Sequence, residues 1–422
     1  MTNSNNELDD PIPAPKNNWS FFNGLPLFVI AISLTALFYF RRNQDPAWWI
    51  EIGFILSAAA TISILIAEAC DPFADAAQWV GKQLRLPSSV RGATLDAIAS
   101  SMPELFTGLF FVIVALTGDK DQAQRLVDSA QGYGSTIATC AGSSIYNLIL
   151  IPAACAIAVS YSRKNKPYVE IEREVVQRDG MWVVLTQVGL LVFLFQPKLD
   201  WWMGVVALAA YIIYVAHLYI ATRRYQVQLA DGKIEIEQSD EKASIFFGTF
   251  DIQLNGLTST LILIFATLVA AIACYLLVDL TNQSAAKLEV SPFFVAVILT
   301  AAVSSIPDTF MSLGSARRGD DSGAVSNVFG SNIFDICVGM SIPLLACCYL
   351  NDWQPINLVG LDDETYSGVV GLRIFLFVLT AIAMSVMWFR RQITRTTGWI
   401  FVALYGLFFG YAVIGALGIS SI

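Results

Sequence analysis

The chain has 422 residues, of which 55% are hydrophobic and only 14% charged, and its mean hydropathy is +0.60. Soluble domains carry roughly 25% charged residues, so a single water-soluble fold is excluded. A net charge of -9 argues against binding to nucleic acid, which requires a basic surface. The partners that fit this composition are inorganic cations and membrane lipids.

Eleven apolar stretches are each long enough to cross a bilayer, which needs about 20 residues. They predict an all-α polytopic membrane protein. The polar segment 1–20 is typical of a flexible tail and not of a secretory signal, because no small-residue cleavage site follows the first apolar run. The spans are expected at 21–40, 48–77, 90–117, 133–160, 181–196, 201–221, 257–280, 292–315, 323–350, 370–389 and 397–418.

Lys and Arg are unevenly divided between alternate connections, with 17 on one side and 5 on the other. The positive-inside rule assigns the richer set, including the polar connection 222–256, to the cytoplasm. Arg41 and Arg42 would then lie outside, so either 21–40 does not cross completely or the rule is locally overridden; we favour a full crossing. A plasma membrane or a bacterial inner membrane fits this arrangement.

Two pairs of similar segments show an internal repeat. AIASSMPELFT at 97–107 resembles AAVSSIPDTFM at 301–311, at an offset of 204, and GSSIYN at 142–147 resembles GSNIFD at 330–335, at an offset of 188. The difference predicts an insertion in the first copy at the polar run 118–131. Because the copies begin five spans apart, they enter the membrane from opposite faces, as in the inverted repeats of many secondary transporters.

The repeat divides the chain into two halves of similar architecture. The expected organisation is a tail at 1–20, an extra N-terminal helix and linker at 21–47, a first half at 48–221, a cytoplasmic linker at 222–256 and a second half at 257–422.

Each copy places a carboxylate directly after a proline in the middle of an apolar helix. Pro103 and Pro307 should kink or break their helices, and Glu104 and Asp308 follow them. An ionised acid at that depth costs roughly 2.5–3.5 kcal/mol on insertion scales. No Lys or Arg occurs at matching depth in 90–117, 133–160, 292–315 or 323–350. A bound cation is the expected compensator.

Hydroxyls and carboxylates are the hard oxygen donors that suit Ca²⁺ and Na⁺. A purely structural role is the alternative, and it is most plausible for Asp335, whose repeat partner is a neutral asparagine. Asp96, Glu68, Asp71 and Asp75 are expected at helix ends or in a vestibule, and His217 is expected as a hydrogen-bonded interior residue. The candidate donors beside the two acids are Ser100, Ser101, Ser304, Ser305, Ser143, Ser331, Asn147 and Asp335.

These motifs resemble the calcium/cation antiporter superfamily, whose two repeats carry a Ser-Ser/Thr-x-Pro-Glu/Asp core and a GS-x-x-x-N/D continuation. Within it, the chain is most similar to the potassium-dependent sodium/calcium exchangers. The segments that carry this likeness are Cys70-Asp71-Pro72-Phe73, Gly92-Ala93-Thr94, 103–107 and 330–336.

The resemblance implies a core of ten helices with a shared ion site. It implies that Ca²⁺ is held by Glu104 and Asp308, with backbone oxygens near Ser100 and Ser304, and that the residue matching Asp335 is associated with K⁺ cotransport. The Na⁺ or K⁺ ligands that it implies are Ser101, Ser143, Asn147, Ser305, Ser331 and Asp335, with the backbone oxygens of Ala97 and Ala301.

The chain departs from the family at a few positions. Ala99 replaces the usual glycine before the serines, Thr139 and Cys140 stand where small or polar ligands are typical, and Arg91 and Asp96 are unusual near the start of their span. These departures bear on ion selectivity more than on the fold.

The sequence therefore predicts a secondary antiporter that exchanges Ca²⁺ for Na⁺, with or without K⁺, and not an enzyme. No cofactor is expected, and no phosphate-binding loop for ATP occurs. A proton-coupled or K⁺-independent exchanger remains the alternative within the same superfamily. An intramembrane aspartyl protease and a cation channel are remote alternatives.

Overall fold

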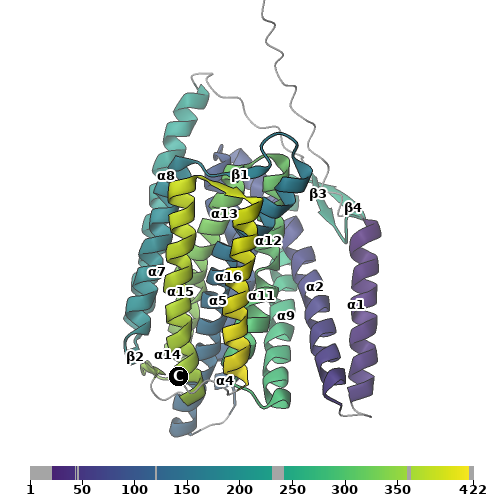
Figure 1. The fold of residues 1–422 in the computed structure, drawn as a ribbon, viewed down its shortest axis with the longest axis vertical. Helices are drawn as coiled ribbons and strands as arrows, with labels where there is room; N and C mark the ends of the chain where they lie inside the picture. Colours follow the sequence, from purple (N-terminus) through teal and green to yellow (C-terminus); the bar gives the residue numbers. More distant parts are fainter. Residues whose placement is uncertain are drawn as a thin grey trace, which may run out of the picture.

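The computed structural model describes residues 21–42, 44, 47–118, 121–230, 242–358 and 363–417. These residues form a helical bundle with three short two-stranded sheets at its ends (Figure 1). This confirms the predicted all-α class. The expected tail, 1–20, lies outside the described residues, as do residues 231–241 of the expected linker.

The first half of the chain is built from long helices that run back and forth along the bundle. Two of its turns, labelled η, are π-helical. Its elements are α1 (Phe21–Arg42), α2 (Trp48–Gln83), α3 (Ser88–Arg91), η1 (Gly92–Asp96), α4 (Ala97–Leu116), α5 (Gln122–Ser162), β1 (Tyr168–Glu170), α6 (Arg173–Val175), η2 (Val176–Gly180), α7 (Met181–Leu194), β2 (Lys198–Leu199) and α8 (Trp201–Ala230).

The second half repeats this pattern after a short hairpin. Its elements are β3 (Lys242–Ile245), β4 (Phe250–Gln253), α9 (Gly256–Leu288), α10 (Pro292–Val295), η3 (Ala296–Thr300), α11 (Ala301–Ser304), α12 (Ile306–Arg318), α13 (Asp321–Phe334), η4 (Asp335–Gly339), α14 (Ser341–Leu350), β5 (Ile356–Asn357), α15 (Asp363–Arg390), β6 (Gln392–Thr394) and α16 (Arg395–Ala416).

Ten helical stretches in the described part of the chain are long and apolar enough to cross a membrane. They correspond to ten of the eleven predicted spans, including the extra N-terminal helix at Gly24–Arg42. The eleventh, predicted at 181–196, is observed as α7, which has only 14 residues. Because α7 continues from α6 and η2, the chain is nevertheless helical without a break from Arg173 to Leu194.

Arg42 is accommodated at the end of α1 by contacts with α2. Its guanidinium lies 4.4 Å from the ring centre of Phe54, and its Nε lies 3.7 Å from Glu51 Oε2. A cation over an aromatic face and beside a carboxylate is stabilised locally. These contacts give the Arg42 side chain partners on α2, although its Nη1 is buried without a hydrogen-bond partner among the described residues.

Within the predicted insertion at 118–131, the described residues from Gln122 onward are helical. The side chain of Asp121 accepts a hydrogen bond from Gln124 N at 2.8 Å and caps the start of α5. An N-terminal aspartate of this kind starts a helix efficiently. Most of this polar run therefore lengthens α5, which has 41 residues.

The two prolines behave differently from one another. In the second half the helix breaks at Ser305, between α11 and α12, as predicted. In the first half no break occurs, because Pro103 lies inside the continuous helix α4. Ser100 Oγ, three residues before this proline, donates to the carbonyl of Asp96 at 2.9 Å, and a π-helical turn precedes the segment in both copies, η1 in the first and η3 in the second.

Strand pairing reveals the inverted relation of the two halves. β1, which follows α5, pairs with β6, which follows α15, while β2, which follows α7, pairs with β5, which follows α14. Each strand pair therefore joins a connection of the first half to a connection of the second half. β1, the earlier strand of the first half, pairs with the later strand β6, and β2 pairs with the earlier strand β5. β1 and β2 lie at opposite ends of the bundle (Figure 1).

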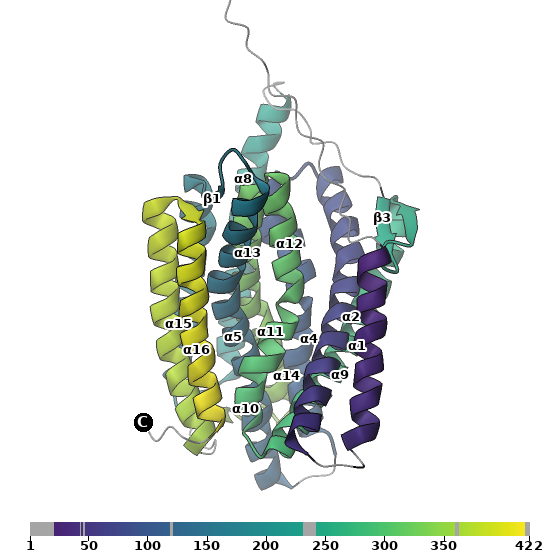
Figure 2. The same ribbon diagram turned by 45° about the vertical axis from the view of Figure 1, so that its right-hand side comes forward.

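One flank of the bundle carries elements outside the ten core helices. Figure 2 shows α1 and β3 beside α2, with α15 and α16 on the opposite flank. Phe247, in the β3–β4 turn, donates its backbone N–H to Glu68 Oε2 at 2.9 Å, and its ring lies 5.5 Å from that of Phe28. The hairpin is thus fixed to both α1 and α2.

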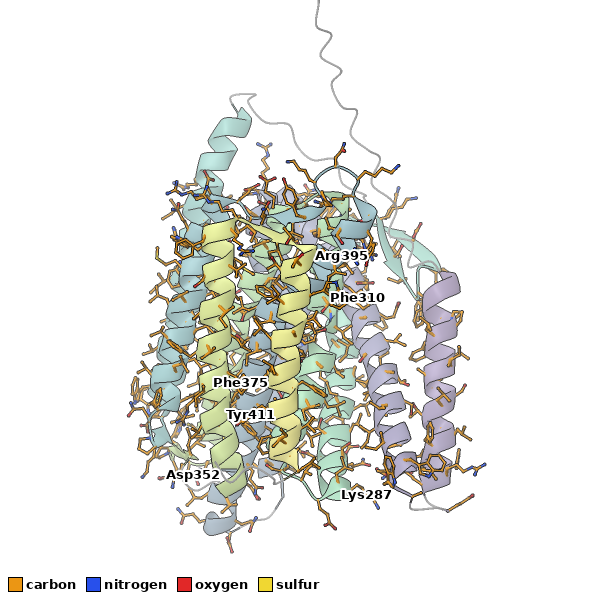
Figure 3. The ribbon with its side chains drawn as sticks, in the orientation of Figure 1. Lys287, Phe310, Asp352, Phe375, Arg395 and Tyr411 are labelled. Carbon is orange, nitrogen blue, oxygen red and sulfur yellow. The ribbon has the colours of Figure 1, made fainter. Side chains whose placement is uncertain are left out.

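On the opposite flank, aromatic side chains join the last two helices. The rings of Phe375 and Tyr411 lie 4.8 Å apart between α15 and α16 (Figure 3).

Candidate functional site

The site lies where α4, α5, α12 and α13 meet in the interior of the bundle. Glu104 is on α4, Asp308 is in the first turn of α12, and Asp335 begins η4 directly after α13. All three acids are completely buried. The other predicted site residues are equally inaccessible, with exposures of 0 or 1%: Ala97, Ser100, Ser101, Ser143, Asn147, Ala301, Ser304, Ser305 and Ser331.

Ser143 of α5 occupies the centre of the site. Its Oγ lies 3.0 Å from Glu104 Oε1, 3.0 Å from Asp335 Oδ2 and 2.8 Å from Ser305 Oγ. A serine hydroxyl has a single hydrogen to donate. It therefore cannot satisfy both carboxylates at the same time.

Asn147, one turn further along α5, connects two of the acids. Its Nδ2 lies 3.3 Å from Asp335 Oδ2 and 3.4 Å from Asp308 Oδ2. The two amide hydrogens can serve both carboxylates. Ser143 and Asn147 together place the three acids in one polar cluster.

The two halves hold their paired acids in the same way. Ser143 donates to Glu104, and its repeat partner Ser331 donates to Asp308 Oδ1 at 2.5 Å. Ser331 Oγ also lies 3.4 Å from Ser100 Oγ. Each serine thus comes from the helix that follows its acid in the same repeat.

The backbone oxygens expected at the site are partly engaged by serines. Ser100 Oγ lies 3.4 Å from the carbonyl oxygen of Ala97, and Ser304 Oγ lies 3.3 Å from that of Ala301. The latter carbonyl also accepts the backbone N–H of Ser305 at 3.2 Å.

The cluster contains more acceptors than donors. Glu104 Oε2, Asp335 Oδ1 and Asn147 Oδ1 are buried and have no hydrogen-bond partner among the described residues. None of the ion pairs found in the described part of the chain includes these acids. Buried anionic oxygens are stable only with a compensating charge, and this donor set suits a hard cation.

The site differs from a metal centre made of acidic, histidine or cysteine ligands alone. Across the described residues, no group of three or more His, Cys, Asp or Glu has the spacing to hold a metal ion. Hydroxyl, amide and backbone oxygens would have to complete the coordination of a cation here.

Glycines of the repeat allow the close packing that builds the site. A Cβ on Gly330 would lie 2.5 Å from the carbonyl oxygen of Ala93 in η1, and one on Gly142 would lie 2.9 Å from Ala301 Cβ. Each helix that carries the GS motif therefore packs closely against the other repeat.

Three polar residues behind the site were not among the predicted ligands. Gln187 Nε2 lies 2.5 Å from Ser144 Oγ, and Ser144 donates to Asn332 Oδ1. Ser144 and Asn332 occupy the same repeat position, which was a signal in the sequence. For Gln187, the only indication in the sequence was that an amide side chain occurs within an otherwise apolar stretch.

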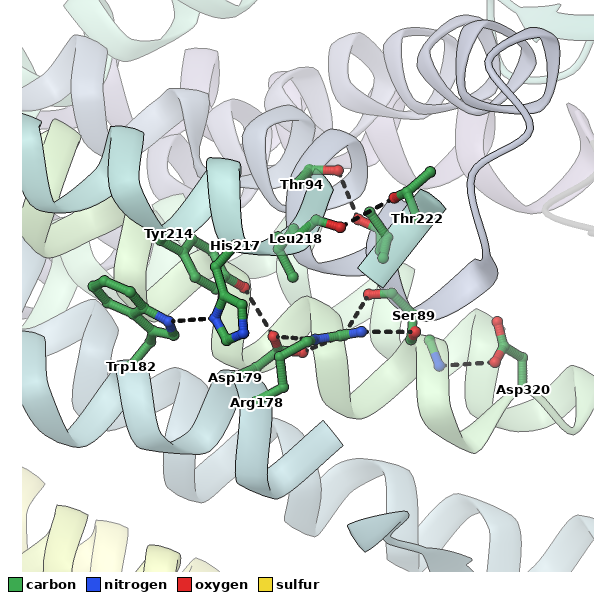
Figure 4. A network of polar contacts seen from close by, with 12 residues as sticks. Ser89, Thr94, Arg178, Asp179, Trp182, Tyr214, His217, Leu218, Thr222 and Asp320 are labelled. Carbon is green, nitrogen blue, oxygen red and sulfur yellow. Dashed lines mark hydrogen bonds and ion pairs between the residues drawn. The ribbon is translucent and has the colours of Figure 1, made fainter. Parts of the chain in front are cut away.

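The other acids and the histidine lie outside this cluster. Glu68 binds the β3–β4 turn as described above. His217 accepts a hydrogen bond from Trp182 Nε1 at 3.1 Å, as expected, but it is exposed on α8 and not interior (Figure 4). Figure 4 also shows the bidentate pair of Arg178 and Asp179, with both oxygens of Asp179 at 2.7 Å.

The fold and the site together define a polytopic helical membrane protein with an inverted repeat around buried carboxylates. Residues 50–220 and 258–414 match the family described as "Sodium/calcium exchanger protein". The match covers well over half of the chain. The chain belongs to this family of transporters, which confirms the resemblance seen in its motifs.

Curated relatives match over part of the chain. Sodium/potassium/calcium exchanger 3 of Rattus norvegicus is 28% identical over 173 residues, which are 41% of this chain and 24% of the relative. Sodium/potassium/calcium exchanger 2 of Homo sapiens is 32% identical over 148 residues, which are 35% of this chain and 21% of the relative. These alignments span no more than a quarter of the relatives' length.

Solved structures of the sodium-calcium exchanger NCX_Mj share the fold. The form soaked with 2.5 mM Na⁺ and 1 mM Sr²⁺ gives a TM-score of 0.52 at 20% identity, covering 84% of this chain and 96% of that one. The form soaked with 10 mM Na⁺ and no Ca²⁺ gives a TM-score of 0.51 at 20% identity, covering 85% and 97%.

Proposed function

We propose that this protein is a secondary antiporter that exchanges Ca²⁺ for Na⁺ across a membrane. The observation that carries the proposal is the cluster of three completely buried carboxylates with unpartnered oxygens. Membership of the sodium/calcium exchanger protein family supports it. We propose a plasma or bacterial inner membrane as its location, with the connection between the halves facing the cytoplasm, an orientation that the positive-inside rule supports.

The proposed ligands divide between the two kinds of ion. Glu104 and Asp308 bind Ca²⁺, with oxygens near Ser100 and Ser304. Na⁺ uses the remaining donors of the cluster, and K⁺, where it is cotransported, uses Asp335. The donors for these monovalent ions are Ser101, Ser143, Asn147, Ser305, Ser331, Asp335 and the backbone oxygens of Ala97 and Ala301.

Competition for shared oxygens couples the two fluxes. The Ser143 hydroxyl lies 3.0 Å from a carboxylate oxygen of both Glu104 and Asp335. A Ca²⁺ bound at Glu104 therefore alters the orientation of the hydroxyl that a Na⁺ near Asp335 requires as a ligand. Bound cations neutralise the acids and lower the cost of moving them through the hydrophobic interior. The cluster without a cation keeps that cost, so the exchanger changes its accessible face only when loaded.

Cotransport of K⁺ is the finer part of the proposal. It is supported by the partial similarity to two exchangers whose names include potassium. A proton-coupled or K⁺-independent exchanger would use the same acids. Uptake driven separately by Na⁺, K⁺ and pH gradients distinguishes these options.

Calcium-45 uptake into proteoliposomes tests the function. Wild-type protein should accumulate Ca²⁺ when an outward Na⁺ gradient is imposed, and Glu104→Gln or Asp308→Asn should reduce this uptake at least about 100-fold. Asp279→Asn is the matched control, since Asp279 is exposed on α9 and its carboxylate bonds to Gln283. A wild-type rate of Ca²⁺ uptake in Glu104→Gln would refute the proposed site. Cleavage of a peptide by the purified protein would instead indicate a protease. An ion conductance far above the turnover of a transporter would indicate a channel.

A further inference from the structure

Three polar side chains from three helices form a hydrogen-bonded chain beside the cation site. Gln187 Nε2 of α7 donates to Ser144 Oγ of α5 at 2.5 Å, and Ser144 donates to Asn332 Oδ1 of α13. Asn332 Nδ2 then donates to the carbonyl of Val328 at 2.9 Å. The three side chains are 2%, 0% and 0% exposed, so the chain runs entirely through the interior.

This hydrogen-bonded series of side chains joins α5 and α13, the helices that carry Ser143 and Ser331. Ser144 and Asn332 are repeat partners, and each directly follows a serine that donates to an acid: Ser143 to Glu104 and Ser331 to Asp308. Neighbouring residues on an α-helix are fixed relative to each other by 3.6 residues per turn. A bond between Ser144 and Asn332 therefore also fixes the rotation at which Ser143 and Ser331 face their carboxylates.

Gln187 joins this arrangement from a third helix. It enters from α7, a helix whose outward side chains include the exposed Leu185 and Val188. Its Oε1 is buried without a hydrogen-bond partner among the described residues. Burying an amide is costly unless it is hydrogen-bonded, and the bond to Ser144 is the contact that Gln187 makes with another helix.

We propose that Gln187 is a positioning residue for cation binding, which acts through Ser144 and Asn332. This inference rests on the proposed exchange function. Gln187 holds α5 and α13 in the register that directs Ser143 and Ser331 at Glu104 and Asp308. Its loss lowers the affinity for both ions without removing any ligand.

The first test measures ion affinity and turnover separately. In Gln187→Leu, the Ca²⁺ concentration for half-saturation, measured by equilibrium calcium-45 binding in detergent, should rise about fivefold, within the range expected for one interhelical hydrogen bond. The half-saturating Na⁺ and Ca²⁺ concentrations for exchange should rise similarly, while the maximum rate per folded protein stays within about twofold. Thr186→Val is the matched control, because the Thr186 hydroxyl bonds only to carbonyls of its own helix among the described contacts.

A double-mutant cycle tests whether Gln187 acts through Ser144. In a Ser144→Ala background, Gln187→Leu should change the half-saturating Ca²⁺ concentration by less than about twofold. Unchanged affinity in Gln187→Leu, a loss confined to the maximum rate, or independent effects of the two changes would each overturn the inference. The binding measurement decides this even if wild-type vesicles show no exchange, which would refute the proposed function alone.

Discussion

Asn147 Nδ2 lies 3.3 Å from Asp335 Oδ2, and these two residues occupy the same position in the two repeats, 188 residues apart. Ser144 and Asn332, one turn away, also contact each other at the same offset. The pseudo-two-fold axis of the bundle therefore passes between these pairs. On this axis one half supplies an amide and the other a carboxylate, which gives the cluster three acids instead of two or four.

This asymmetry predicts the effect of exchanging the two side chains. Asp335→Asn removes one of three negative charges, so we expect Ca²⁺/Na⁺ exchange to persist but to lose its stimulation by K⁺. Calcium-45 uptake with and without K⁺ measures this. The double variant Asn147→Asp/Asp335→Asn keeps three acids and should recover part of the K⁺ stimulation; undiminished stimulation in Asp335→Asn would show that the acid has no such role.

The close approach of α13 to η1 predicts intolerance of a single methyl group. A Cβ on Gly330 would lie 2.5 Å from the Ala93 carbonyl oxygen, and the backbone cannot move cheaply there. We expect Gly330→Ala to lower the free energy of unfolding by about 1–3 kcal/mol and to reduce exchange. Thermal unfolding in detergent provides the measurement.

Gly410 supplies the control for that substitution. It lies in α16, and nothing lies within 4 Å of a Cβ placed on it. Gly410→Ala should leave stability unchanged or raise it by about 0.5–1 kcal/mol, since alanine is the better helix former. Equal losses in both variants would contradict the packing argument.

The Arg163–Asp321 pair predicts a stabilising contact at one end of the bundle. The guanidinium makes two bonds to the carboxylate, at 2.7 and 3.1 Å, and also reaches the carbonyl of Ala316. Asp321 additionally accepts the backbone N–H of Glu170 at 2.9 Å. We expect Arg163→Gln to cost about 1–3 kcal/mol of unfolding free energy, because a mostly buried carboxylate loses its cationic partner.

An exposed pair in the same region is the control. Lys166 and Glu170 lie 3.1 Å apart, with side-chain exposures of 66% and 54%. Exposed pairs contribute little to stability, so Lys166→Gln should leave the melting temperature unchanged. A comparable loss for both variants would show that burial does not decide the contribution.

The backbone conformation of the β3–β4 turn leads us to expect that a substitution there destabilises the hairpin locally. Phe246 and Phe247 both adopt positive φ angles, 51° and 58°, which non-glycine residues rarely do. The contacts of Phe247 with Phe28 and Glu68 hold this conformation. Phe247→Ala should therefore increase amide exchange across 242–253, measured by hydrogen–deuterium exchange mass spectrometry.

Phe250, which is 59% exposed on the same hairpin, provides the comparison. Phe250→Ala should leave amide protection nearly unchanged. If Phe247→Ala also left it unchanged, the hairpin would have to be fixed by other contacts.

Much of the fold was accessible from hydropathy and the repeat. Apolar length located the spans, because a bilayer imposes a nearly constant length on them. The four π-helical turns were not predicted, since no residue pattern distinguishes them from α-helix. The difference between Pro103, which lies within the continuous helix α4, and Pro307, which follows a break at Ser305, was not predicted, since both prolines follow two serines at the same spacing.

The gathering of the predicted ligands could be anticipated only by analogy between the copies. Spacing along a helix showed that Ser100 and Glu104 share a face, but contacts such as Ser143 to Ser305 depend on packing between helices far apart in sequence. Gln187 could not be identified beforehand, because nothing in the sequence states which way one amide in an apolar helix points. Which ion each residue binds remains a prediction.

The exchanged strand pairs have a consequence for how the protein can come apart. β1 and β2 belong to the first half, yet their hydrogen-bonded neighbours, β6 and β5, both belong to the second. The two halves are therefore joined by a strand pair at each end of the bundle. Separating the two halves would therefore break backbone hydrogen bonds at both ends of the bundle at once.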